Sequence, residues 1–343
     1  MAGTQQEVLA GGEAARGGAA LRAGKYAIAL SVAAGIAASM LALAPAAQAA
    51  AAAPNATARI QALLNKPVDG IVDLPSGTFS VQPTLKLQQG ERIIGHGTTL
   101  RVATGSGNYY AMLTGTDATT DLSGLAITGV TFDQNSSGNP IRTSAPLFNG
   151  KPRFVLLIAA GTGIKITNDR FIGSDNVDTI VTGGATQNVT ISHNEFATIN
   201  TPLHDHSTIY TSGTDTVISD NTFTGRALVD SAAIEVHGDH ASITGNHVSG
   251  YYKAANIVAS DTTFQGNHVS GAANPVDLWS VTSAGLRNVT VTGNVLNRNL
   301  AHWARVLRSL GGSLPTARST GQVTRDAHST QSFHDITIGH NKG

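Results

Sequence analysis

A short phrase with a central Asn recurs along this 343-residue chain, and it limits the possible fold more than any other feature. "NVTISHNEF" (Asn188–Phe196) is followed by the similar "TVISDNTF" (Thr216–Phe223) and "ASITGNHV" (Ala241–Val248). Aligned on the Asn, the copies are spaced by 21 to 27 residues, except for a final spacing of 47 residues. The aligned positions are Asp169, Asn194, Asn221, Asn246, Asn267, Asn294 and Asn341. A period of this length is the signature of a solenoid, in which similar coils stack on one another.

Each repeat is predicted to contain short strands rather than helices. Helical repeats need about 33 residues or more, whereas Val, Ile and Thr alternate in these phrases and are followed by Gly or Asn, as in strands between tight turns. Parallel strands of neighbouring coils lie about 4.8 Å apart, so Asn side chains at one turn can hydrogen-bond to the backbone and to each other. We therefore expect a buried, structural Asn ladder, and we expect the final spacing of 47 residues to contain one irregular extra coil.

The repeats resemble those of right-handed parallel β-helix proteins of the pectate-lyase-like superfamily. "GIVDLPSGTFSV" (Gly70–Val81) and "RIIGHGTTLRV" (Arg92–Val102) are similar to the first coils of such proteins, and "ATARIQALLN" (Ala56–Asn65) has the pattern of a short helix that caps the open end. The resemblance implies an all-β fold, a single-stranded right-handed parallel β-helix of about nine or ten coils with a short N-terminal capping helix. The superfamily includes lyases, hydrolases, epimerases and non-catalytic proteins, so the fold does not name the reaction.

The first 49 residues have the pattern of an export signal. Arg16, Arg22 and Lys25 precede the apolar run Tyr26–Ala44, and Ala47–Ala49 provides a small-residue cleavage site. The run is nearly long enough for a membrane anchor, but the proline that ends it and the cleavage site favour export. The predicted division is a signal peptide over residues 1–49, a cap region over 50–67 and the β-helix over 68–343. We expect a secreted protein with no membrane contact after cleavage.

Composition excludes several classes of function. The chain has no Cys, which excludes disulfides, thiolate metal sites and Cys nucleophiles. The formal net charge is zero, so nothing indicates a nucleic-acid partner held by electrostatic attraction. A neutral or acidic soluble partner is expected instead.

The second strand of each predicted coil indicates where function lies, because a β-helix buries one face of each strand and exposes the other. The inward positions are predicted to be Ile180, Ile209, Ile234, Ala255 and Val276. The next position then points outward in each coil, at Val181, Tyr210, Glu235, Asn256 and Asp277. Two residues later, a second outward set contains Gly183, Ser212, His237, Val258 and Trp279. Such a mixture of acids, bases and aromatic residues predicts a groove for a chain-like sugar, with Asn256, Asp277 and Trp279 binding the substrate.

One chemistry that fits these residues is β-elimination on a uronate polymer. A base removes the proton beside the sugar carboxylate, which must be neutralised for the proton to be acidic. Lys253, His206 or Tyr210 is the expected base, and Asp205, Asp230 and Glu235 are expected ligands of a Ca²⁺ ion, the one cofactor considered. The predicted catalytic group is Asp205, His206, Tyr210, Asp230, Glu235, His237 and Lys253.

Glycoside hydrolysis is the alternative chemistry, because two carboxylates could flank the bond. Asp205 and Asp230 are expected on adjacent coils, roughly 5 Å apart, as in a retaining enzyme. Glu235 and Asp277 are expected two coils apart, roughly 9–10 Å, at the upper limit for an inverting pair. The leading hypothesis is an exported lyase acting on an acidic polysaccharide. Its rivals are a hydrolase of the same fold and a non-catalytic solenoid that binds glycans through Tyr210 and Trp279.

Overall fold

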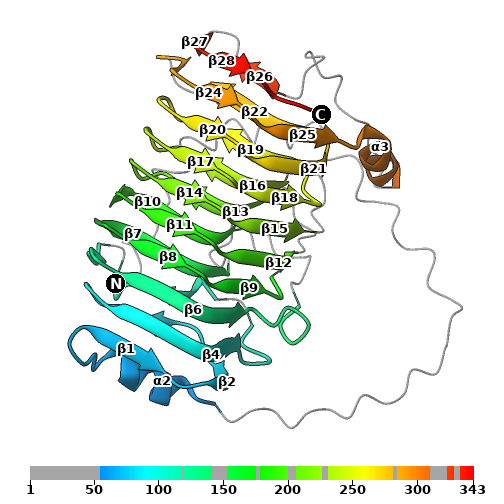
Figure 1. Ribbon diagram of the computed structural model, residues 1–343. Coiled ribbons are helices and arrows are strands. Elements are labelled where there is room, and N and C mark those ends of the chain that lie inside the picture. Colours follow the sequence, from blue (N-terminus) through cyan, green and yellow to red (C-terminus); the bar gives the residue numbers. More distant parts are fainter. Residues whose placement is uncertain are drawn as a thin grey trace, which may run out of the picture.

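The computed structural model describes residues 55–107, 109–117, 119–140, 153–174, 178–199, 206–225, 231–280, 284–309, 323–327 and 333–343. Within these residues the chain forms a parallel β-solenoid of about 8 turns with two helices, somewhat fewer turns than the nine or ten predicted. The coils stack from α2 and β1 at one end to β28 at the other (Figure 1). The predicted export signal lies outside the described residues. Neither helix in the described part of the chain has the length and apolar character needed to span a bilayer.

Two large parallel sheets form the walls of the solenoid. The seventeen-stranded sheet contains β1 (Ile71–Leu74), β2 (Gly77–Val81), β4 (Arg92–Val102), β6 (Ala126–Asp133), β8 (Lys165–Thr167), β9 (Arg170–Ile172), β11 (Thr190–Ser192), β12 (Glu195–Ile199), β14 (Val217–Ser219), β15 (Thr222–Gly225), β17 (Ser242–Thr244), β18 (His247–Ser249), β20 (Thr263–Gln265), β21 (His268–Ala272), β24 (Thr290–Thr292), β25 (Val295–Arg298) and β28 (Thr337–Gly339). The nine-stranded sheet contains β3 (Leu85–Lys86), β5 (Ala111–Thr114), β7 (Phe154–Thr162), β10 (Asp178–Gln187), β13 (His206–Thr211), β16 (Ser231–Val236), β19 (Lys253–Ile257), β22 (Asn274–Ser280) and β26 (Val323–Ala327). A small third sheet pairs β23 (Leu286–Arg287) with β27 (Phe333–His334).

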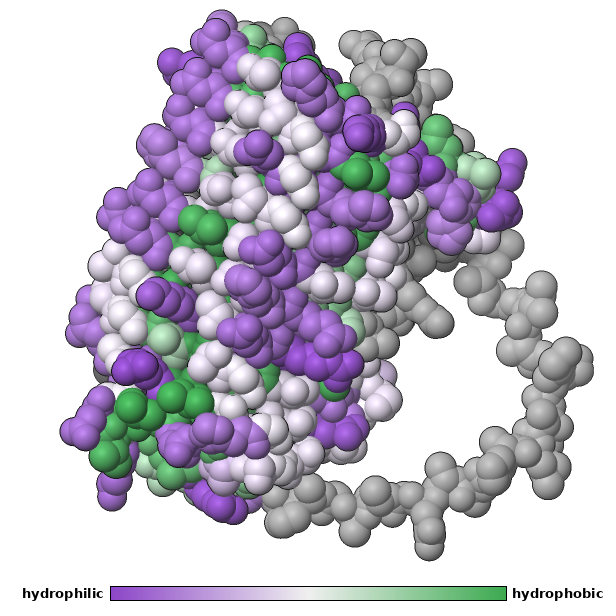
Figure 2. Space-filling view, viewed as in Figure 1, coloured by the Kyte–Doolittle hydropathy of each residue, from purple (hydrophilic) through white to green (hydrophobic). Residues whose placement is uncertain are grey.

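Helix α2 (Thr57–Leu64) lies against the first coil, where the sequence predicts a cap. It buries Ile60 and Leu64 in the main core. The side chain of Gln61 bonds to the backbone of Lys86 as both donor and acceptor, at 3.0 and 2.8 Å, and so replaces a neighbouring strand there. The side of the solenoid that faces the viewer is covered mainly by hydrophilic and intermediate residues, with hydrophobic ones gathered near α2 and β1 (Figure 2).

The Asn ladder predicted from the repeats is present. The backbone N–H of Asn194 donates to Oδ1 of Asn221 at 2.9 Å, and its Nδ2 donates to the carbonyl of Ile166 in the preceding coil at 2.9 Å. The same two bonds recur at each Asn rung up to Asn294, which donates to Oδ1 of Asn341 at 3.0 Å. The residue before each rung adopts a left-handed conformation and makes the turn; these residues are Asn168, His193, Asp220, Gly245, Gly266, Gly293 and His340.

The last coil corrects the prediction of an irregular extra coil. Asn294 bonds directly to Asn341, and β24 pairs directly with β28, so the spacing of 47 residues is a single coil that carries an insertion. The insertion contains α3 (Leu300–Ser309) and β26, which pairs with β22 and continues the nine-stranded sheet. The interruption over Ala301–Arg325 is therefore partly a helix beside the solenoid and partly a strand of its wall.

The foot of the ladder differs from the other rungs because it is an acid. Asp169 is 2% exposed; its Oδ1 accepts the N–H of Val130 at 2.8 Å, while no described residue bonds to its Oδ2. Every Asn rung has at that place an Nδ2 that donates to a backbone carbonyl. Burial raises the pKa of Asp169 to about 8. Glu91, also buried and with neither carboxylate oxygen bonded to a described residue, has its pKa raised by burial to about 7.

The first prediction concerns one rung of the ladder. In Asn221→Leu the backbone N–H of Asn194 loses its side-chain acceptor, and Oδ1 of Asn246 loses the Nδ2 donor while it keeps the backbone N–H of residue 221. The free energy of unfolding should therefore fall by about 1–3 kcal/mol. Urea denaturation measures this change. Asn297→Leu is the matched control, because Asn297 is exposed on β25 and should change stability little. Equal stability of the two variants would contradict a supporting role for the rung.

The second prediction concerns the acid at the foot. Because the pKa of Asp169 is higher in the folded chain than in the unfolded one, the folded state holds more protons between about pH 4 and pH 8. Its contribution to stability therefore falls as pH rises through that interval. Asp169→Asn should stabilise the protein at pH 8–9 and have progressively less effect toward pH 4, as measured by urea midpoints. A stabilisation that does not change with pH would show that Asp169 does not titrate in this way.

Candidate functional site

The outward column predicted from the sequence is present on the nine-stranded sheet. We define the outward column as the aligned residues Val181, Tyr210, Glu235, Asn256, Asp277 and Thr324. The alternate positions Ile180, Ile209, Ile234, Ala255 and Val276 are fully buried in the core, which confirms the predicted register. Parallel pairing of neighbouring coils thus brings residues 21 to 47 positions apart in sequence to a spacing of about 4.8 Å.

A break in the strand alternation adds residues to the same face. Ala233 and Ile234 are consecutive and both lie in the main core, as do Ala254 and Ala255 one coil later. The residues just before them, Asp178, Ser207, Ala232, Lys253 and Asn274, are aligned across the coils. Contacts from Ser207 and Lys253 to acids of the outward column show that this second set shares the outward face. Simple alternation of inward and outward residues did not predict that Ser207 faces outward. The available signal in the sequence was the adjacent pair of inward residues in later coils, such as Ala233 and Ile234.

Glu235 and His237 form a hydrogen-bonded pair. His237 Nε2 lies 2.7 Å from Glu235 Oε1, and the Ser207 hydroxyl donates to Oε2. The His237 and Glu235 side chains are only 7% and 10% exposed. An ionised Glu235 accepts at both oxygens and so holds the proton of His237 on Nε2. Nδ1, to which no described residue hydrogen-bonds, is then the atom that can take up a proton, and the ring packs against Tyr210 with centroids 4.9 Å apart.

Lys253 and Asp277 form a second buried pair. Nζ of Lys253 lies 3.3 Å from Asp277 Oδ2, with the two side chains 10% and 6% exposed. Thr324 of β26 donates to Asp277 Oδ1 at 2.8 Å and accepts from Asn274 Nδ2 at 2.6 Å. The Thr324 hydroxyl thus accepts a hydrogen bond from the Asn274 amide and donates its own proton to Asp277. Both oxygens of Asp277 therefore have a polar partner in the protein.

Asn256 lies between these two pairs in the outward column. It aligns with Glu235 on one side and Asp277 on the other, and it is 6% exposed. Its Oδ1 is buried and accepts no hydrogen bond from the described residues. A buried acceptor without a donor is unfavourable by about 1–3 kcal/mol. A ligand hydroxyl placed here would satisfy it.

The outward face is apolar toward the N-terminal coils. Ala111, Phe154, Leu157, Val181 and Tyr210 form one buried cluster, against which Tyr110 packs. The rings of Tyr110 and Phe154 meet edge to face, with centroids 5.6 Å apart. Trp279, two residues after Asp277 on β22, is 9% exposed. Along the axis the face therefore passes from the apolar cluster to the Glu235–His237 and Lys253–Asp277 pairs.

Two solved structures have a similar fold. A tailspike protein of Escherichia coli bacteriophage HK620, solved with a pentasaccharide, has 14% sequence identity and a TM-score of 0.53 over 70% of this chain and 53% of its own. The Streptococcus pneumoniae surface protein and adhesin PfbA also has 14% identity and a TM-score of 0.53, over 81% of this chain and 83% of its own. The chain has the right-handed parallel β-helix fold of pectate-lyase-like proteins.

These likenesses concern the fold of the β-helix alone. The chain spans about half the length of the tailspike protein that it matches. Its sequence matches no protein-family model and no curated protein.

Three predicted site residues of this β-helix remain untested. Asp205 and Asp230 lie outside the described residues, as does the side chain of His206, whose backbone pairs with Ser231. Glu235, the described member of the predicted Ca²⁺ site, is hydrogen-bonded to Ser207 and His237. Within the described ranges, no group of three or more His, Asp or Glu side chains is arranged to hold a metal ion. Because two of its three expected ligands, Asp205 and Asp230, lie outside the described residues, the Ca²⁺ site stays a prediction.

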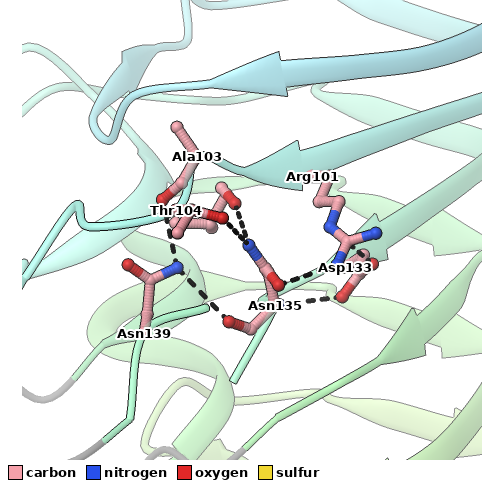
Figure 3. Close-up of polar contacts among 7 residues, drawn as sticks. Arg101, Ala103, Thr104, Asp133, Asn135 and Asn139 are labelled. Atoms are coloured by element: carbon pink, nitrogen blue, oxygen red, sulfur yellow. Dashed lines mark hydrogen bonds and ion pairs between the residues drawn. The ribbon is translucent and has the colours of Figure 1, made fainter. Parts of the chain in front are cut away.

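A second polar cluster, away from the outward column, anchors a loop. Asn135 accepts a hydrogen bond from Arg101 at 2.8 Å and donates to the carbonyl of Val102 at 2.9 Å, and Asn139 donates to the carbonyl of Ala103 at 3.1 Å (Figure 3). Asp133 accepts the Asn135 N–H at 2.8 Å. These bonds tie the chain after β6 to the end of β4. The residues of this cluster do not include a His–carboxylate pair like that of Glu235 and His237.

The third prediction tests the coupling of Lys253 and Asp277. Removing either charge leaves the other in a largely buried position, so Lys253→Met and Asp277→Asn should each destabilise the fold by several kcal/mol, of the order of 3–5. The double variant should lose less folding free energy than the sum of the losses in the two single variants. A double-mutant cycle in urea measures this difference, and a coupling near zero would mean that the pair does not interact in solution.

Proposed function

We propose that this β-helix protein is an exported lyase that binds an acidic polysaccharide on the outward face and cleaves it by β-elimination. The observation that carries the proposal is the Glu235–His237 hydrogen bond, because it leaves Nδ1 of His237 as a proton acceptor beside the ring of Tyr210. A base held in one tautomer by a carboxylate is an arrangement suited to proton abstraction.

The reaction needs three contributions from this face. Nδ1 of His237 takes the proton on the carbon beside the sugar carboxylate, and the electron pair of that C–H bond forms a double bond in the ring. The neighbouring C–O bond to the next sugar breaks, and the departing oxygen takes a proton, for which the Tyr210 hydroxyl is the proposed donor. The amide of Asn256 and the ammonium of Lys253 are proposed to stabilise the substrate carboxylate, whose charge increases as the proton leaves.

Hydrolysis is a second candidate because of one geometric feature. Glu235 and Asp277 align two coils apart, which corresponds to about 9–10 Å, at the upper limit for an inverting pair. Hydrolysis also needs one carboxyl group to carry a proton. Both acids have their two oxygens engaged by polar groups of the protein, so neither is placed to give a proton to a glycosidic oxygen, which makes elimination the better proposal.

The compared proteins add weight to a glycan ligand and to a location outside the cell. One was solved with a bound pentasaccharide, and the other is described as a surface protein and adhesin. Together with the export signal predicted over residues 1–49, they support the proposal of a secreted or surface-located protein. An adhesin-like role corresponds to the non-catalytic rival, which requires binding without turnover.

The fourth prediction separates these functions. A panel of polysaccharides is assayed for the ultraviolet absorbance of unsaturated uronates and, in parallel, for new reducing ends. Elimination raises both signals, hydrolysis raises only the second, and a binder raises neither. His237→Asn should reduce the rate of elimination by about 10²–10⁴-fold. Glu235→Gln should reduce it as well, because the carboxylate no longer keeps the proton of His237 on Nε2.

The matched control is His247→Asn, an exposed His on β18 of the other sheet, which should leave turnover unchanged. Full activity in both His237→Asn and Glu235→Gln would move the chemistry away from the outward column. Reducing ends without absorbance would favour the hydrolase.

A further inference from the structure

The inserted helix α3 presents a basic face that the proposed reaction does not use. Between Asp277 and Asp326 the chain contains six Arg residues and no acidic residue, although acids and bases are equal in number over the whole sequence. Three basic side chains, His302, Arg305 and Arg308, are exposed at intervals of three residues on α3. Residues three apart lie on the same side of a helix, so these three form a stripe, which we call the basic stripe.

No described acidic residue neutralises the two arginines of the basic stripe. Neither Arg305 nor Arg308 forms an ion pair with a described residue, whereas elsewhere Arg101 and Arg170 pair with acids. Arg308 lies in the last turn, where a cation is favoured by the helix dipole, but Arg305 lies in the middle of the helix and has no such role. Unpaired cations on one side of a helix attract an anionic partner.

Helix α3 is held firmly to the solenoid on its opposite side. Trp303 is 1% exposed, donates from Nε1 to the carbonyl of Gly271 at 2.8 Å and meets the ring of Tyr252 edge to face. Asn299 caps the helix by accepting the N–H of His302 at 3.0 Å. Figure 1 shows α3 projecting from the side of the stack, and Figure 2 shows hydrophilic side chains on its projecting end. Ordering the helix in advance reduces the entropy cost of binding there.

The anchor places α3 beside the candidate site. Trp303 and Leu307 pack against Tyr252 and Ala273. Tyr252 directly precedes Lys253, and Ala273 directly precedes Asn274, so the helix is fixed at the starts of the two strands that carry the Lys253–Asp277 pair. A long chain bound on the outward face near this pair is therefore within reach of the helix.

We propose that the basic stripe of α3 is an accessory binding site for a polyanionic glycan, which contacts Arg305 and Arg308 through its carboxylates. The proposal rests on the acidic substrate class of the proposed function and extends it, because it assigns the recognition of the polymer to a segment outside the outward column. Short oligosaccharides that fill only the outward column do not reach the stripe, so the helix selects long chains over short ones.

The test measures binding separately from cleavage. The His237→Asn variant of the full chain is titrated with polygalacturonate, polymannuronate and neutral dextran at two salt concentrations. Adding Arg305→Gln and Arg308→Gln should lower the affinity for the acidic polymer that binds by about tenfold or more and weaken its salt dependence, because fewer counterions are displaced. Binding of trimers of the same sugar should stay unchanged. Lys165→Gln with Arg92→Gln, which removes two exposed cations from the other sheet, is the control for net charge.

The outcomes separate this inference from the proposed function. If acidic polymer is cleaved by the unmodified protein but bound equally well by the α3 variant, the inference fails and the proposed function stands. If the control loses as much affinity as the α3 variant, the effect is one of net charge, and the stripe is not a site. If no acidic polymer binds, or if only dextran binds, both proposals fail.

Discussion

The hydrogen bond between one coil and the next is the interaction on which this molecule depends. In the Asn ladder each side chain accepts from the backbone of one neighbouring coil and donates to a carbonyl, so buried amides at the turn are satisfied by identical groups above and below. The aromatic stack formed by Phe171, Phe196 and Phe223 repeats the same logic with apolar groups, at centroid separations of 4.8 and 4.7 Å. Each coil therefore depends on its neighbours for both polar and apolar contacts.

The candidate site follows from that stacking. Glu235, Asn256 and Asp277 come from three coils, and strand pairing alone gives them a common direction and a regular spacing. The rigid ladder supplies positions, while the side chains on the outer surface are free to vary. Burial of Lys253 and Asp277 excludes water, which strengthens their mutual attraction relative to a pair on the open surface.

The sequence predicted the parts of the structure that repeat. Seven aligned rungs revealed the ladder, and the inward Ile residues fixed the register of the outward column. It placed Lys253 in the same groove as Glu235 and Asp277, but it did not reveal that Ser207 turns to this face. The extra inward residue is an Ala in two later coils, and Ala gives no clear signal of direction. Thr324 was also missed, since a long insertion separates it from its partner Asp277 and only the pairing of β26 with β22 brings them together. Local exceptions of this kind depend on side-chain packing that the repeat pattern of the sequence does not encode.

The insertion within the last coil, between Asn294 and Asn341, shows what the ladder tolerates. A stretch that contains a whole helix lies between two rungs, yet the rungs bond to each other as closely as any others. Loops can therefore lengthen without disturbing the stack, whereas the distance between two site residues can change only by whole coils. Removal of the coil that carries Asn256 would bring Glu235 beside Asp277, and duplication of it would add one amide between them. The spacing of reactive groups in such a molecule therefore changes in steps of one coil. Related β-helices can diverge by the gain or loss of whole coils as well as by the exchange of side chains.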